Sequence, residues 1–100
     1  MIRVNPPQDI FRIWIARFAD WQPGTWQDLP DEAVVLELAA PGWYDAHQAM
    51  AYIEGHNRAA IQRADDRWAV AVPVRLTYQG DPRPGETISP RRLTERAWRA

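Results

Sequence analysis

The stretch "RWAVAVPVRLTY", residues 67–78, decides the fold that this sequence predicts. Large apolar or aromatic side chains occupy every second position, and smaller or polar ones fill the positions between them. Because successive side chains of a strand point to opposite faces of a sheet, this alternation predicts a half-buried β-strand. Pro73 has no N–H to donate, so we expect the strand at a sheet edge or with a bulge there.

Three other segments are predicted to be strands. "AVVLELA", residues 33–39, alternates in the same way. "IFRIWIARF", residues 10–18, would also make a helical stripe, but its isoleucine and aromatic residues favour a strand. The turn-rich "GDPRPGE", residues 80–86, would lead the chain into a short return strand near Thr87 and Ile88.

Two helices complete the predicted pattern. The longer one is expected from about Tyr44 to Ala64, after the turn at Pro41 and Gly42. At about 100° per residue, one stripe of this helix is small or apolar. The stripe consists of Ala46, Ala49, Met50, Ile53, Ala60, Ile61 and Ala64. Ser89 and Pro90 suit the cap and first turn of a terminal helix that runs through about Trp98.

One hundred residues are enough for one modest core, so we expect a single small α+β domain over residues 1–100. Its small mixed sheet has three to four strands in the order ββαββα, and the long helix covers one face. A right-handed crossover makes strands 33–39 and 67–78 parallel neighbours or separates them by the first strand. Residues 90–100 are expected to form a basic tail or a docking helix.

Several classes of function are excluded or disfavoured by composition. The chain has no cysteine, which removes disulfides, thiolate nucleophiles and cysteine metal sites, and its only serine, Ser89, is explained as a helix cap. No glycine-rich phosphate loop is present, and we expect no cofactor. No apolar run approaches the roughly 20 residues that span a bilayer, so we expect a soluble cytoplasmic protein without membrane contact.

A metal site is not expected on the long helix. His47 and His56 are nine residues apart, which places them on opposite sides. Glu54 shares a side with His47 but lies about 10 Å along the axis. A small-molecule pocket or active site that combines Tyr44, Asp45, His47 and His56 remains an alternative, although N-terminal capping and packing explain the first of these residues better.

Asn57 occupies the centre of the apolar stripe, between Ile53 and Ile61, while Gly55 points the opposite way. A buried amide without partners costs on the order of 1–3 kcal/mol. We therefore expect the Asn57 side chain to hydrogen-bond to the backbone of a loop or strand beneath the helix.

The net charge of -1 conceals an acidic middle and a basic end. No basic residue lies between Arg17 and Arg58, an interval with seven acidic ones. The basic end carries Arg91, Arg92, Arg96 and Arg99. With Trp98 it could bind single-stranded nucleic acid, but the acidic body would repel a polyanion, and docking on the acidic centre of this chain or a neighbour fits better.

The sheet face away from the long helix supplies the leading functional hypothesis. One helix cannot cover both faces, so an aromatic and small-residue patch is expected on the other one. The patch consists of Trp14, Phe18, Val35, Ala69, Ala71 and Pro73. We expect a non-enzymatic protein that acts through protein contact or self-association at this face, a homodimer being one such assembly. Closure of the face by the chain's own tail and by the loop between Trp21 and Trp26 is the alternative.

Overall fold

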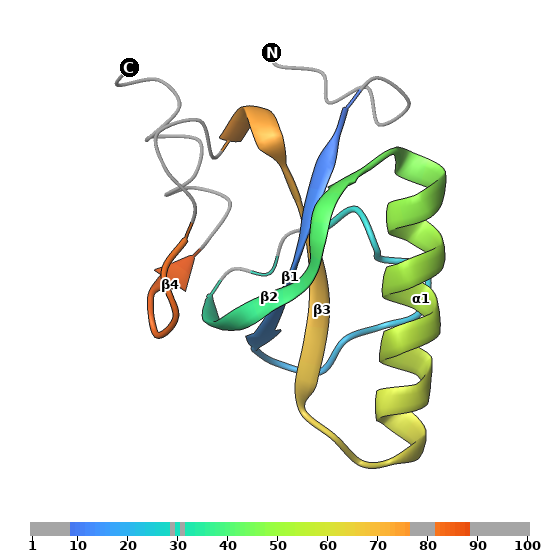
Figure 1. The fold of residues 1–100 in the computed structure, drawn as a ribbon. Coiled ribbons are helices and arrows are strands. Elements are labelled where there is room, and N and C mark those ends of the chain that lie inside the picture. The colour runs from blue at the N-terminus through green and yellow to red at the C-terminus, as the bar shows by residue number, and fades with distance from the viewer. Residues whose placement is uncertain (1–8, 29, 31, 77–81, 89–100) are drawn as a thin grey trace.

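The computed structural model describes residues 9–28, 30, 32–76 and 82–88, and its elements form an antiparallel sheet with one helix (Figure 1). The elements are β1 (Phe11–Arg17), β2 (Ala33–Tyr44), α1 (Ala46–Gln62), β3 (Arg67–Pro73), a 3₁₀ turn (Val74–Leu76) and β4 (Thr87–Ile88). No helix in the described ranges has the length and apolar character to cross a membrane. The expected terminal helix and the four arginines of the basic end lie outside these ranges.

The strand order is β3-β1-β2-β4, with β1 antiparallel to both long neighbours. β2 and β3 therefore run parallel to each other with β1 between them, which is the second of the two expected arrangements. β4 is only two residues long and pairs with Ala33 and Val34 of β2, not with β3. β1 takes the central place because it is apolar on both faces, with Phe11 and residues 13–16 all buried.

β2 is longer than the sequence predicts, since it continues past residue 39 to Tyr44. We expected Pro41 and Gly42 to form the turn before the helix, but both lie within the strand. Gly42 has φ +100°, a left-handed conformation that glycine adopts readily, and its carbonyl accepts a hydrogen bond from Arg12 at 3.3 Å. Irregular register between β1 and β2 accommodates this segment.

β3 is shorter than predicted, because it ends at Pro73 and a 3₁₀ turn follows. The N–H of Val74 then donates to the carbonyl of Ile10 at 2.8 Å. Pro73 is thus the last residue of an edge strand, a position where a missing N–H costs no ladder hydrogen bond.

α1 begins and ends slightly inside the predicted limits. Asp45 caps it: the Asp45 carboxylate accepts from the Gln48 N–H at 2.8 Å, and the Gln48 side chain accepts from the Asp45 N–H at 3.0 Å. The helix stops at Gln62, and Ala64 follows in a left-handed conformation with φ +53°. This is the usual end of a helix, here without the glycine that favours it.

The face of the sheet that packs on α1 differs from our expectation at β3. Ala69 and Ala71 lie in the helix-side cluster, together with Phe11, Ile13 and Ile15 of β1. The expected placement of both alanines on the opposite face is wrong. α1 packs mainly on β3, and small side chains allow this close approach.

The opposite face forms a second buried cluster rather than an open patch. This cluster consists of Trp14, Ala16, Ala33, Val35, Val70 and Val72. The Trp14 side chain is only 5% exposed and Val35 is fully buried. Pro73 is also buried, and Phe18 is half-buried at the margin of both clusters. The six residues expected to form an accessible patch are therefore core or near-core residues in this structure.

Candidate functional site

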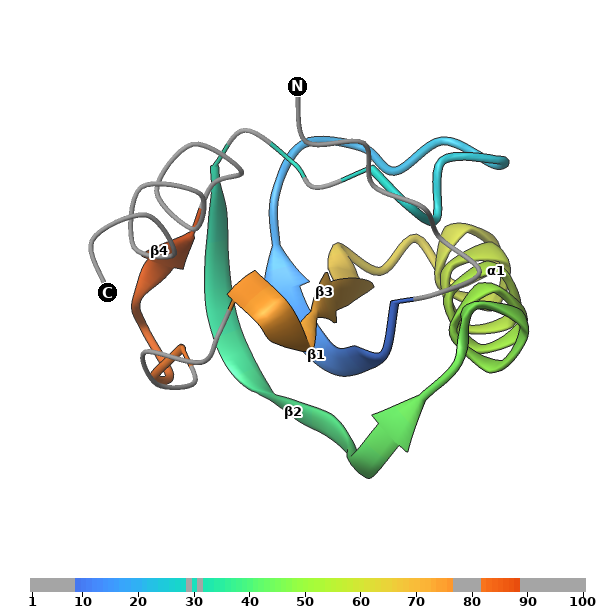
Figure 2. The same cartoon turned by 90° about the horizontal axis from the view of Figure 1, so that it is seen from above.

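The segment between β1 and β2 leaves the sheet, reaches α1 and returns, as Figures 1 and 2 show. Its tip is fastened to the helix, because the N–H of Gly24 donates to the Glu54 carboxylate at 2.8 Å. Thr25 closes a turn by donating its hydroxyl to the Gln22 carbonyl at 2.6 Å. The positive φ of Gly24, +84°, lets the chain reverse at this point.

Two hollows open where this segment faces the helix and sheet, and Trp21 lines both. The first encloses about 680 Å³ and has an apolar floor of Ile53, Ala69 and Val70. Its walls carry Phe18, Trp21 and Trp26, and its exposed carboxylates are Asp20, Asp28 and Glu32. Phe18 and Ala69, from the predicted contact patch, thus line an accessible hollow here.

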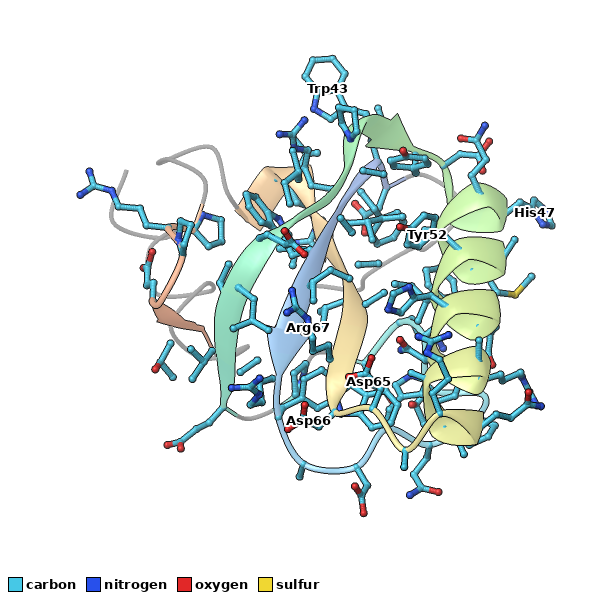
Figure 3. All side chains as sticks on the ribbon, turned by 60° about the horizontal axis from the view of Figure 1, so that its bottom comes forward. Trp43, His47, Tyr52, Asp65, Asp66 and Arg67 are labelled. Atoms are coloured by element: carbon cyan, nitrogen blue, oxygen red, sulfur yellow. The ribbon has the colours of Figure 1, made fainter. Side chains whose placement is uncertain are left out.

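The second hollow encloses about 450 Å³ and shares Asp20, Trp21 and Gln22 with the first. Asp65, Asp66 and Trp68 complete its polar and aromatic lining. Figure 3 shows Asp65 and Asp66 together where the chain passes from α1 into β3. We call the two hollows with their lining residues the Trp21 site.

Aromatic contacts hold the walls of the Trp21 site in place. Trp21 stacks on Trp68 with ring centroids 6.4 Å apart, and Phe18 lies 6.2 Å from Trp68. Trp26 meets Phe11 edge to face at 5.5 Å. These arrangements are favourable for aromatic rings; Trp21 and Trp68 are buried, whereas Phe18 and Trp26 are half-buried and keep part of their ring surface exposed.

Every charged side chain among the described lining residues of the Trp21 site is negative. Asp66 pairs with Arg17 at 3.2 Å and Asp65 with Arg63 at 3.8 Å. In contrast, no described residue forms a hydrogen bond or ion pair with the three remaining carboxylates. These are Asp20, Asp28 and Glu32. Uncompensated carboxylates next to aromatic walls produce a local negative potential that favours a cation.

The alternative pocket at the start of α1 is not assembled. Asp45 is the helix cap, and the Tyr44 hydroxyl donates to the Pro41 carbonyl at 3.1 Å. His47 points away from the sheet into solvent (Figure 3). His56 stacks on Tyr52 at 6.0 Å on another side of the helix. None of the four predicted residues lines either hollow.

Metal ligation receives no support from the described ranges, where no three His, Asp or Glu side chains gather closely enough to hold an ion. Asn57, for which the sequence predicts backbone partners, is fully buried and makes two hydrogen bonds with Ala69. Its role in this structure is to join α1 to β3.

The sequence signal for the Trp21 site lies in "DWQPGTWQD", residues 20–28, where each tryptophan has an aspartate one or two residues away. We read these residues only as a loop that could close the sheet. Asp65 and Asp66 are distant in sequence, so nothing local indicates that they line the same site. No protein-family model, no curated protein and no solved structure matches this chain.

Proposed function

We propose that this chain is a binding protein that contacts an arginine-rich segment of a protein partner through the Trp21 site. The observation that carries the proposal is the composition of the lining: among the described residues, the two adjoining hollows have five carboxylates, four aromatic side chains and no basic side chain. The proposal keeps protein contact as the function and moves the surface from the buried sheet face to this site.

Arginine fits the chemistry better than other cations. Its flat guanidinium group stacks on tryptophan and donates two parallel hydrogen bonds to one carboxylate. The first hollow, at about 680 Å³, lies within the roughly 300–1,000 Å³ of typical ligand pockets. It therefore has room for an arginine side chain with part of its backbone.

The expected affinity is modest. The carboxylates of Asp20, Asp28 and Glu32 are exposed, and an exposed ion pair contributes about 0.2–1 kcal/mol. With one or two cation–π contacts of about 0.5–1 kcal/mol each, the contributions sum to at most about 5 kcal/mol, which corresponds to Kd values of about 0.2 mM or weaker at low salt. Added salt should weaken binding, because the carboxylates are screened by solvent ions.

The test is a titration with a tetra-arginine peptide amide, followed through the indole N–H resonances in a ¹⁵N correlation spectrum. Trp21→Phe and Trp26→Phe variants assign the two relevant resonances. We expect these two to move most, and we expect the triple variant Asp20→Asn/Asp28→Asn/Glu32→Gln to lose most of the binding. Glu37→Gln is the matched control, since its carboxylate pairs with Arg67 at 2.8 Å outside the site.

Equal binding by the triple variant and the native chain would refute the assignment. A single-stranded oligonucleotide that moved the same two resonances would favour nucleic acid as the partner instead. If sedimentation of the chain without peptide detected a species heavier than 11.6 kDa, self-association would be favoured instead.

A further inference from the structure

We propose that the arginine segment of this same chain, residues 89–100, occupies the Trp21 site and competes with external arginine ligands. This inference rests on the proposed function, because it assigns a second occupant to the same site. The segment itself lies outside the described residues, and three features of the described part and of the sequence carry the argument.

The direction of the chain is the first feature. β4 pairs with β2 so that Ala33 is opposite Ile88 and Val34 is opposite Thr87. Ala33 directly follows Glu32, a lining residue of the first hollow, so the described chain ends at Ile88 next to the acidic side of the site. The antiparallel pairing thus directs the chain toward the acidic side of the site.

Charge is the second feature. Residues 89–100 contain four arginines and one glutamate, which leaves three net positive side chains. The site contains three carboxylates that no described residue neutralises, namely Asp20, Asp28 and Glu32. The charges of the arginine segment and of the site are therefore opposite in sign and similar in magnitude.

Reach is the third feature. Twelve extended residues span at most about 40 Å, and the longest dimension of the molecule is 40 Å. The first hollow is well within this distance of Ile88, because Ile88 pairs with Ala33, the neighbour of its lining residue Glu32. A tethered segment has an effective concentration on the order of millimolar, so contacts that are weak individually are sufficient to populate the bound state.

The experiment compares the full native chain with a full-length variant in which Arg91, Arg92, Arg96 and Arg99 are all changed to Gln. A second variant with the same four positions changed to Lys keeps the charge and serves as the matched control. The readouts are the indole N–H resonances of Trp21 and Trp26 and the Kd of the tetra-arginine peptide.

We expect the Gln variant to shift both resonances and to bind the peptide about 5- to 10-fold more tightly, as for a site that its own segment fills about 80–90% of the time. The Lys variant should resemble the native chain. The native resonances should not change over a roughly tenfold range of protein concentration, because the contact is intramolecular.

Unchanged resonances in the Gln variant, together with equal peptide affinity, would overturn this inference and leave the proposed function intact. Failure of the peptide to bind either chain, with no shift between them, would overturn both. Resonances that depend on protein concentration would show that the segment docks on a second copy, which contradicts the intramolecular assignment.

Discussion

The Asn57 carboxamide forms hydrogen bonds with both backbone polar groups of Ala69, as a neighbouring β-strand would. The Asn57 amide donates to the Ala69 carbonyl at 3.0 Å, and the Ala69 N–H donates to the Asn57 oxygen at 2.7 Å. Ala69 belongs to β3, which is an edge strand. One fully buried side chain of α1 therefore satisfies both polar groups that the sheet leaves open at this residue.

Asn57→Ala should lower the free energy of unfolding by about 2–5 kcal/mol, because it leaves the N–H and C=O of Ala69 buried without partners. Urea unfolding followed by tryptophan fluorescence measures the change. Gln62→Ala, at an exposed position of the same helix, should alter stability by less than about 0.5 kcal/mol. A loss below 1 kcal/mol in the Asn57 variant would contradict this role.

Asn57→Asp should lower the free energy of unfolding by an amount that depends on pH. A protonated aspartate can keep both hydrogen bonds, whereas the buried carboxylate faces the Ala69 carbonyl and lacks a donor. Burial raises the pKa of the introduced acid in the folded state above the unfolded value of about 4. The stability of the variant is then closest to that of the native chain below about pH 4, and it falls as the pH rises. Urea midpoints of both chains at acidic and neutral pH test this, and a constant difference would oppose it.

Val35 and Val34 are adjacent residues of β2 that test whether the sheet face away from α1 is a core. Val35 is fully buried in the second cluster, and Val34 is 39% exposed. Val35→Ala should cost about 1–3 kcal/mol of unfolding free energy, and Val34→Ala about 0.5 kcal/mol or less. Similar small losses at both positions would mean that this face is open in solution.

Gly55→Ala should stabilise the protein by about 0.5–1 kcal/mol. Gly55 lies inside α1 on an exposed position, and an added Cβ would meet no atom within 4 Å. Thermal unfolding measures the gain. Gly42→Ala is the opposing control: Gly42 has space but φ +100°, so a side chain there should destabilise by about 1 kcal/mol or more. Loss of stability at Gly55 would indicate a contact that this structure lacks.

Ala64→Gly should also stabilise the fold, by up to about 1 kcal/mol. Ala64 has φ +53°, a conformation that costs a residue with a Cβ about 1–2 kcal/mol, and glycine removes this cost while losing more chain entropy on folding. Ala51→Gly, inside the helix at an exposed position, should instead destabilise by about 1 kcal/mol. If both substitutions lowered the stability of the fold equally, the left-handed conformation assigned to Ala64 would be wrong.

The sequence by itself determined the approximate positions of β1, β2, α1 and β3, and which residues share a side within each. The alternation in residues 67–73 and the apolar stripe around Asn57 are local, because side-chain direction follows from the backbone repeat alone. A local repeat does not determine which side of a strand or helix packs against another element. Val70 and Val72 were as suitable as Ala69 and Ala71 for the helix side until the close approach of α1 favoured the alanines.

Tertiary structure alone decided the pairing of β4 with β2, the continuation of β2 through Pro41 and Gly42, and the burial of Trp14. It also brought Asp65 and Asp66 next to Trp21, more than forty residues away in the chain. These outcomes depend on contacts between distant segments, whose free energies arise only when several elements pack at once. A periodic pattern identifies the faces of an element, and packing between elements determines which faces are covered.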